Sequence, residues 1–289
     1  MSKSFYFILN PISGTSTEIE RIRTLVQNYM NTKTYTLLET KYKGHASELA
    51  KKAVEHAIDV VVAIGGDGTV NEIASELIDT QTSLAVLPKG SGNGFARNLT
   101  IPMNMESALK RILNGEKKCV DTGVLNKRPF VGVTGTGFDA YISKLFDKRQ
   151  VRGFLSYIKL SLKEYVSYQP KLYQVTIDDQ EFTKSAFLIT VGKSRQYGNN
   201  AQIIPCAELS DGKLHVGISK KIPLFYTPLF IYQLFTGTLE RSTFISYASG
   251  KKIRIVSDDS MIFHLDGEPV DVGKEAEIII KPKSLYVIC

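Results

Sequence analysis

The amino-acid sequence predicts an α/β domain with a parallel sheet, followed by a second domain built as an antiparallel β-sandwich. Up to Asp121, short apolar segments alternate with amphipathic helical segments, which is typical of parallel sheets. Beyond Asp121, short strand-like segments are separated by turn dipeptides such as Asp178-Asp179 and Asp211-Gly212, which is typical of antiparallel sandwiches. We therefore expect an α/β domain at residues 1–122 and a β-sandwich domain at residues 123–289.

The first domain is expected to follow the order β-α-β-α-β-α-β. Its strands are predicted at residues 5–9, 34–38, 60–64 and 83–87, and its helices at residues 16–30, 44–57 and 69–77. Ligands of parallel sheets bind beyond the carboxyl ends of the strands. Three polar, glycine-bearing turns fall at these ends, at Asn10–Gly14, Gly65–Thr69 and Pro88–Gly94.

The most informative stretch is residues 60–72, which reads V-V-V-A-I-G-G-D-G-T-V-N-E. A buried strand runs into Gly65-Gly66, and a helix is predicted from Thr69. A glycine turn that leads into a helix N-terminus can bind an anion through backbone N–H groups. Asp67 is unusual there, because a carboxylate beside phosphates is repulsive unless a cation or a reacting proton lies between them. The stretch therefore predicts a nucleotide-phosphate site that also performs chemistry, in preference to a purely structural turn.

Other motifs give weaker signals. The third turn, P-K-G-S-G-N-G, has a glycine content that favours a functional role, but the chain has no Walker loop. Residues 135–140 fit a dinucleotide-binding fingerprint, yet the acidic residue that should follow is missing, so we reject a cofactor site there. The four histidines show no metal-ligand spacing.

Composition limits the classes of partner and compartment. The net charge of +7 suits a nucleotide or an anionic membrane surface and does not indicate nucleic-acid binding. The three cysteines are widely spaced, which favours a reducing, cytoplasmic compartment. The apolar segment at residues 1–9 is too short for a signal peptide. The most apolar stretch, Ile222 to Phe235, is interrupted by prolines and does not span a membrane.

The second domain contains one further candidate for chemistry. Its strands are predicted at residues 130–134, 172–177, 182–191, 213–218, 252–257, 261–265 and 276–280, with one helix at residues 154–168 packing on the sheet. Asp266-Gly267 is a tight-turn pair, so Glu268 can be held rigidly after a hairpin-like turn. A carboxylate placed in this way can accept a proton from an attacking hydroxyl during phosphoryl transfer. A solvated glutamate in an ordinary turn is the alternative.

Ile222 to Phe235 allows two interpretations. With its aromatic residues and the preceding Lys220-Lys221, the segment could lie at a lipid surface, with the lysines on anionic head groups. A buried core helix explains the composition equally well.

Taken together, the motifs resemble the soluble diacylglycerol kinase and sphingosine kinase family of lipid kinases. The motifs that carry the likeness, in chain order, are Asn10–Gly14, Glu39-Thr40 with Gly44–Ala46, Gly65–Glu72, Pro88–Arg97, Asp121–Gly123, Gly137–Ala140, Asp211-Gly212 and Leu265–Pro269. G-G-D-G-T alone is shared with NAD kinases, whereas its pairing with L-D-G-E-P is more specific. The resemblance implies a NAD kinase/diacylglycerol kinase-like α/β domain that binds ATP and a β-sandwich domain on the lipid side.

The resemblance also implies roles for individual residues. Contacts with ATP would come from Asn10, Pro11, Ile12, Ser13, Gly14, Thr40, Gly66, Asp67, Gly68, Thr69, Val70, Asn71, Glu72 and Ser91. Glu268 would be the proton acceptor for the lipid hydroxyl. Glu208, Asp211 and Lys213 would hold a structural Mg²⁺, the first and third through backbone carbonyls.

Two departures from the family pattern affect what the resemblance implies. Bacterial members usually carry G-T-x-N-D in the third turn, and here Gly94 stands in place of the aspartate. The G-S-G-N form is more similar to the sphingosine kinase branch, which blurs the substrate class. The glycine run expected after Tyr197-Gly198 is interrupted by Asn199-Asn200.

The resulting hypothesis is an ATP- and Mg²⁺-dependent kinase that phosphorylates a hydroxyl of a membrane lipid, diacylglycerol- or sphingosine-like. Asp67 would orient a catalytic Mg²⁺ and the phosphates, and Glu268 would activate the acceptor. We expect a cytoplasmic protein in peripheral contact with the inner face of the membrane, without nucleic acid, and a homodimer is left open. Two alternatives stay open as well: a NAD kinase-like phosphotransferase and a non-catalytic lipid-binding protein on the same scaffold.

Overall fold

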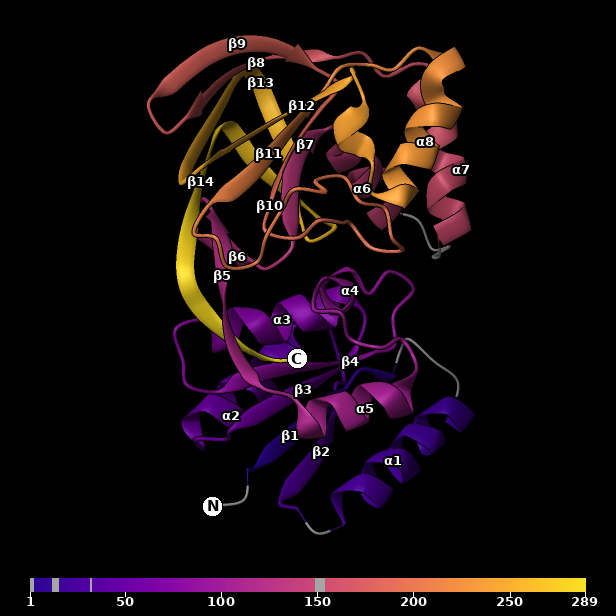
Figure 1. Cartoon of the computed structure of the whole chain (residues 1–289), viewed down its shortest axis with the longest axis vertical. Coiled ribbons are helices and arrows are strands. Elements are labelled where there is room, and N and C mark those ends of the chain that lie inside the picture. The colour runs from indigo at the N-terminus through magenta and orange to yellow at the C-terminus, as the bar shows by residue number, and fades with distance from the viewer. Residues whose placement is uncertain (1–2, 12–15, 32, 149–153) are drawn as a thin grey trace. The chain divides into compact units, whose positions relative to one another are not determined.

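The computed structural model describes residues 3–11, 16–31, 33–148 and 154–289 of the chain (Figure 1). Its contacts divide the chain into two compact units, here called unit 1 (Met1–Val120 with Lys283–Cys289) and unit 2 (Asp121–Pro282). The division at residues 122/123 stays a prediction for the domain boundary. The contacts group residues 283–289 with unit 1, whereas the predicted second domain runs to residue 289.

Unit 1 contains a parallel sheet, as the sequence predicts. Its strands are β1 (Phe5–Leu9), β2 (Tyr35–Glu39), β3 (Val60–Gly65), β4 (Ser83–Pro88) and the last residues of β14 (Glu268–Ile288). The order is β14-β4-β3-β1-β2, and every neighbouring pair is parallel. The carboxyl ends of β1, β3 and β4, each followed by one of the glycine-bearing turns, therefore lie at one edge of this sheet.

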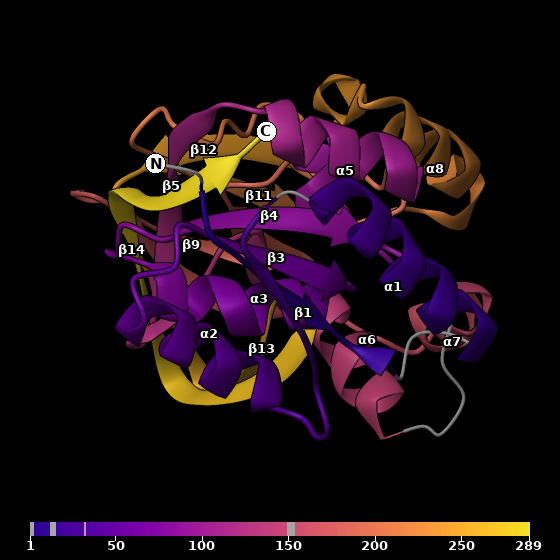
Figure 2. The same ribbon diagram turned by 90° about the horizontal axis from the view of Figure 1, so that it is seen from below.

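Helices cover both faces of the unit 1 sheet (Figure 2). They are α1 (Ser16–Met30), α2 (His45–Glu55), α3 (Asp67–Leu77), α4 (Gly94–Asn98) and α5 (Met105–Asn114). In Figure 2, α1 and α5 lie on one side of the strands and α2 and α3 on the other. Every residue of β3 and β4 is buried, which explains their continuous apolar sequence. Within α3, the predicted apolar face, with Ile73 and Leu77, is buried.

Unit 2 is predominantly antiparallel. Its strands are β5 (Lys117–Leu125, which begins in unit 1), β6 (Arg128–Phe130), β7 (Val133–Gly137), β8 (Lys171–Ile177), β9 (Gln180–Ala186), β10 (Leu188–Gly192), β11 (Leu214–Ser219), β12 (Ile245–Gly250), β13 (Lys252–Leu265) and β14. The main order is β12-β11-β10-β7-β13-β14, and β8 pairs with both β13 and β9. The helical elements are α6 (Phe138–Asp147), α7 (Phe154–Tyr165), η2 (Leu224–Tyr226), α8 (Thr227–Thr236) and η3 (Leu239–Arg241).

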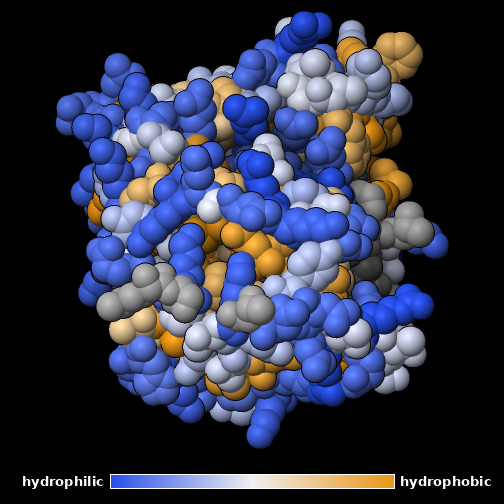
Figure 3. Space-filling view, turned by 60° about the horizontal axis from the view of Figure 1, so that its bottom comes forward, coloured by the Kyte–Doolittle hydropathy of each residue, from blue (hydrophilic) through white to orange (hydrophobic). Residues whose placement is uncertain are grey.

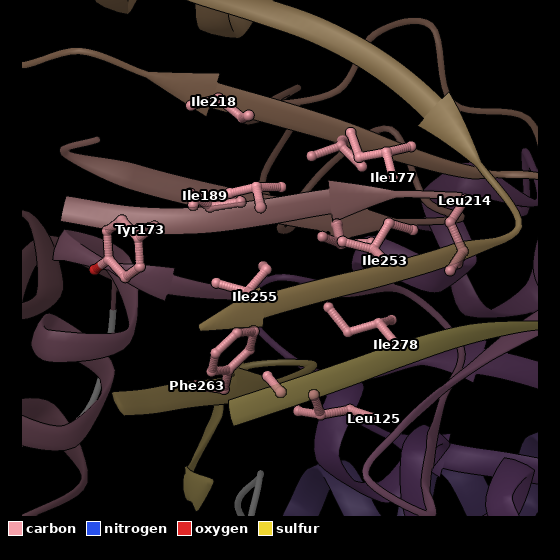
Figure 4. Close-up of a cluster of buried hydrophobic side chains, with 14 of the residues drawn as sticks. Leu125, Tyr173, Ile177, Ile189, Leu214, Ile218, Ile253, Ile255, Phe263 and Ile278 are labelled. Atoms are coloured by element: carbon pink, nitrogen blue, oxygen red, sulfur yellow. The ribbon is translucent and has the colours of Figure 1, made fainter. Parts of the chain in front are cut away.

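The main core of unit 2 consists of side chains that these strands direct inward (Figure 4). Ile253 and Ile255 of β13 are fully buried and belong to one cluster with Ile189 of β10 and Ile278 of β14. The alternation of buried and exposed residues along β8 and β13 places one face of each strand on this cluster. No helix in the described part of the chain is long and apolar enough to cross a membrane.

Several boundaries in unit 2 differ from those predicted. The strand expected at residues 130–134 is two strands, because the N–H groups of Val131 and Gly132 bind the Asp266 carboxylate in place of a neighbouring strand. The strands expected at 252–257 and 261–265 are one long strand with a register shift after Val256.

Candidate active site

Hydrogen bonds join the three glycine-bearing turns of unit 1. The side-chain amide of Asn10 donates to Thr69 Oγ1 at 2.9 Å, which connects the first turn to the second. The N–H of Lys89 donates to the Gly65 carbonyl at 3.0 Å, which connects the second turn to the third. Specific contacts therefore connect the chain at the carboxyl ends of β1, β3 and β4.

Glycine is required where the second and third turns meet. A Cβ atom on Gly90 would lie 2.4 Å from the Cα atom of Gly66, a distance that real side chains do not adopt. The third turn is held in shape by Asn93, whose side chain accepts from the Gly90 N–H at 2.9 Å and donates to the Gly90 carbonyl at 2.7 Å. The two turns thus approach each other backbone to backbone, as glycine permits.

Asp67 begins α3 and lies against the third turn. Its Oδ1 atom accepts from the N–H of Phe95 at 3.3 Å. Burial raises the pKa of the Asp67 carboxyl, and N–H groups of Phe95, Gly94 and Asn93 oppose this shift only in part. A carboxylate with so little solvent is stabilised by a cation, so the site favours positive charge beside Asp67.

The other residues assigned to ATP contacts differ in their burial and in their hydrogen bonds. Thr40 is buried at the end of β2, and the Val70 side chain is part of the core, so only its backbone could meet a ligand. Glu72 accepts from the N–H of Gly44 at 3.1 Å and so fixes the start of α2. Ser91 is exposed. Ile12, Ser13 and Gly14 lie outside the described residues.

One polar atom at this site lacks a partner. The Oδ1 atom of Asn71, on the first turns of α3, is buried and accepts no hydrogen bond from the described chain. Buried acceptors are almost always satisfied in folded proteins. A nucleotide donor would satisfy this atom, so the residues present fit a nucleotide.

Sequence reasoning missed Lys89. Its side chain is 9% exposed, and Nζ lies 3.5 Å from the carbonyl oxygen of Asn10. Burial lowers the pKa of this amine, and the charges of Glu18 and Glu39 oppose the shift. The sequence feature that could have indicated Lys89 is its position between a buried strand and a glycine-rich turn. A partly desolvated lysine beside these turns is a cation that could pair with a phosphate group.

In unit 2, the Asp266-Gly267 turn is the predicted hairpin. Leu265 pairs with Glu268 across it, and Asp266 and Gly267 have φ values of 47° and 95°. These left-handed conformations match a two-residue turn with Asp-Gly at its centre. Glu268 is the first residue of β14 and is exposed to solvent within this structure.

The Asp266 carboxylate fixes this hairpin to the start of β7. It accepts hydrogen bonds from the N–H groups of Val131, Gly132 and Val133 at 3.0, 2.8 and 2.8 Å. In addition, the Ser143 hydroxyl donates to the carbonyl of Gly267. The position of Glu268 is therefore set by a network of bonds that the sequence alone did not reveal.

A second polar network lies beneath the hairpin. The Tyr197 hydroxyl donates to Asp139 Oδ2 at 2.7 Å, and Nε2 of His264 lies 3.2 Å from the same oxygen. Asp139 and His264 are buried and Tyr197 is partly buried, and burial raises the pKa of the Tyr197 hydroxyl well above its usual value. This network connects α6, β13 and the loop after β10.

The contacts argue against the residues assigned to a structural Mg²⁺. Glu208 is exposed, and the Asp211 carboxylate is bound by Lys193 Nζ and His215 Nε2. The carbonyl oxygen of Lys213 accepts from the same Lys193 Nζ. A Mg²⁺ ion held by these oxygens would lie against an ammonium group, so the residues do not fit the ion. Among the described residues, no group of three or more His, Cys, Asp or Glu side chains could hold a metal.

The segment at residues 222–235 is not a buried core helix. No residue of η2 or α8 is buried, and Phe225 and Tyr232 are 87% and 65% exposed. One side of α8 contacts a small core cluster through Phe230 and Leu234. Apolar residues gather along the right-hand edge of Figure 3, the side on which Figure 1 shows α7 and α8. Of the two lysines before it, Lys221 donates to the carbonyls of Val166 and Tyr168.

Comparison with known proteins identifies the family. Residues 4–125 match the model of the diacylglycerol kinase catalytic domain, and residues 132–289 match the YegS C-terminal NAD kinase beta sandwich-like domain. The chain belongs to this family of lipid kinases. It is therefore an enzyme of the phosphotransferase class, and the resemblance and the fold class inferred from the sequence are both confirmed.

One sequence relative agrees with this assignment, and two solved structures share the fold. A Pectobacterium atrosepticum protein named "Probable lipid kinase YegS-like" is 30% identical over 250 residues, which cover 84% of this chain and 82% of the relative. A structure of a diacylglycerol kinase from Bacillus anthracis has a TM-score of 0.77 at 21% identity and covers 99% and 97% of the two chains. Yeast NADH kinase shares the fold more distantly, with a TM-score of 0.51 at 11% identity over 100% of this chain and 84% of its own.

Proposed function

We propose that the chain is an ATP- and Mg²⁺-dependent kinase that transfers the γ-phosphate to a hydroxyl of a membrane lipid, diacylglycerol- or sphingosine-like. One observation carries the nucleotide part of the proposal. The partly buried carboxylate of Asp67 in the second glycine turn accepts from the backbone after the third, and the backbones of these turns approach so closely that Gly90 tolerates no side chain. A site with close N–H groups and a carboxylate that favours a cation suits a phosphate chain that carries a metal ion.

The proposed roles follow the chemistry of phosphoryl transfer, which depends mainly on positioning and electrostatics. Mg²⁺ bound with ATP would offset phosphate charge. Asp67 orients this charged group, and Lys89 lies near enough to the first turn to add positive charge to the phosphates. Asn71 offers its buried Oδ1 to a donor on the nucleotide.

Glu268 is the proposed acceptor of the proton from the lipid hydroxyl. Its support is the rigidity of the hairpin, which three N–H groups hold through Asp266. A general base of this kind contributes about 10²–10⁴-fold to the rate. The hydroxyl oxygen attacks the γ-phosphorus, the bond to the β-phosphate oxygen breaks, and ADP leaves.

The lipid is expected to reach the enzyme at a membrane surface. The exposed apolar residues of η2 and α8 support peripheral contact, together with the exposed Lys220. A hollow of about 380 Å³ beside them is lined by Tyr165, Val166, Lys221, Ile222, Pro223 and Leu224. Its apolar lining suits the hydrocarbon part of a lipid.

Labelled ATP tests this proposal when the purified protein is incubated with either NAD or a fractionated lipid extract. We expect label in a chloroform-soluble product that chromatography identifies. Label in NADP would instead support the NAD kinase-like alternative. Vesicle binding without any transfer from ATP would support a non-catalytic lipid-binding protein.

A further inference from the structure

Lys193 places a fully buried ammonium group in unit 2. Its side chain has no exposed surface, although lysine is one of the residues least often buried. Nζ lies 2.5 Å from Asp211 Oδ1, 2.7 Å from the Lys213 carbonyl oxygen and 3.2 Å from Asp121 Oδ2. An ammonium group has three N–H donors, so each donor has an oxygen acceptor.

The groups around this ammonium form a site for a cation. Asp121 Oδ2 also accepts from the N–H of Gly212 at 2.8 Å, and Asp211 Oδ2 lies 2.7 Å from Nε2 of His215. Each oxygen of the Asp211 carboxylate therefore has a side-chain nitrogen partner, at 2.5 Å for Lys193 and 2.7 Å for His215.

Two of these oxygens, from Asp211 and Lys213, belong to the set that the family resemblance implies for a structural Mg²⁺. Mg²⁺ would need about six oxygen ligands at about 2.0–2.1 Å around a centre of its own. Here the ammonium already occupies the space between the oxygens and neutralises their charge. We propose that the Lys193 ammonium is the built-in structural cation of unit 2, in place of a divalent metal at Asp121, Asp211 and Lys213.

The Lys193 ammonium stabilises the loop between β10 and β11. Lys193 directly follows β10, and Asp211 and Lys213 directly precede β11, so the ammonium joins the two ends of a long irregular loop. That loop carries Tyr197, which donates to Asp139 in the network beneath the Glu268 hairpin. Lys193 is thus a positioning residue that fixes the loop without touching the reacting groups.

Thermal unfolding without nucleotide tests the proposal. The melting temperature of the full-length wild type should be the same in EDTA and in Mg²⁺, Mn²⁺ or Ca²⁺, and elemental analysis should find no stoichiometric divalent metal. Lys193→Ala leaves two carboxylates facing each other and should lower the melting temperature in EDTA on the order of 10 °C. Adding a divalent cation should recover part of that loss, because the oxygens are then free to bind it.

Lys274→Ala is the matched control, because it removes the same charge from an exposed position of unit 2 and should unfold like the wild type. Three results would overturn the proposal: a wild type that retains one equivalent of metal or is stabilised by Mg²⁺, a Lys193→Ala variant as stable as the control, or a Lys193→Ala variant that no divalent cation stabilises. If Lys193→Ala does not fold, the two wild-type measurements still decide the question.

Discussion

Asp266 is expected to hold the hairpin that carries Glu268, and its replacement by alanine tests this. The change removes three hydrogen bonds from N–H groups to a carboxylate, at 2.8–3.0 Å. Counting about 1 kcal/mol for each of these partly buried bonds gives a loss of roughly 3 kcal/mol. Alanine at a φ of 47° adds about 1 kcal/mol of left-handed strain. The expected destabilisation is therefore roughly 4 kcal/mol, by these order-of-magnitude values.

Asp266→Asn separates the effect of the lost hydrogen bonds from the effect of the left-handed backbone conformation. Asparagine tolerates the left-handed conformation and keeps one acceptor oxygen, which can still receive the N–H groups of Gly132 and Val133. Only the bond from Val131 is lost, so we expect a destabilisation of about 1 kcal/mol.

Calorimetry of the full-length variants measures both effects. At about 2–4 °C per kcal/mol, the unfolding transition of unit 2 should fall on the order of 10 °C for Asp266→Ala and about 3 °C for Asp266→Asn. The turnover number should fall in the same order, with the KM for ATP unchanged. Asp179→Ala, at an exposed turn, is the control and should leave the transition in place. An alanine variant as stable as the wild type, or equal losses for both variants, would show that the Asp266 carboxylate does not hold the hairpin.

Asp67, Gly90 and the exposed apolar residues of η2 and α8 can each be tested by substitution. Burial raises the pKa of Asp67, so kinase activity should decline on acidification at a higher pH than for an aspartate with the usual pKa. The folded protein also binds the Asp67 proton more tightly than the unfolded chain, so the free energy of unfolding should fall as the pH rises through the raised pKa. Asp67→Asn should abolish the stability change in pH-dependent unfolding, and a curve identical to wild type would contradict this. Gly90→Ala places a Cβ atom 2.4 Å from Gly66 and should eliminate ATP binding in calorimetric titration; wild-type affinity would show that the turns are not so close. Replacing Phe225 and Tyr232 with serine should weaken binding to anionic vesicles by about tenfold or more without lowering the melting temperature, and unchanged vesicle binding would exclude this surface from the membrane contact.

Elements whose structure depends on neighbouring residues could be predicted from the sequence. β1 and α1 have the predicted bounds, because a short apolar run and a clear helical period determine them. The Asp266-Gly267 hairpin was predicted because few other residue pairs suit two left-handed positions in succession. The helix α3 begins at Asp67 and not at Thr69, because glycines at its start hide the first turn from any pattern of polarity.

Features that depend on long-range contacts could not be predicted. Nothing near Lys193 in the sequence shows that Asp121, 72 positions earlier, meets its ammonium group. The split between β6 and β7 depends on the Asp266 carboxylate, which lies far along the chain. Likewise, Lys89 becomes a candidate for the phosphate site only when the fold brings it near Asn10.

A Glu268→Gln variant tests whether Glu268 accepts the proton of the lipid hydroxyl. Transfer of label from ATP to lipid would be measured beside nucleotide binding, because glutamine keeps the size of the side chain but cannot accept the proton. We expect transfer to fall by about 10²–10⁴-fold while the affinity for ATP stays that of the wild type. Transfer at the wild-type rate would exclude Glu268 as the proton acceptor.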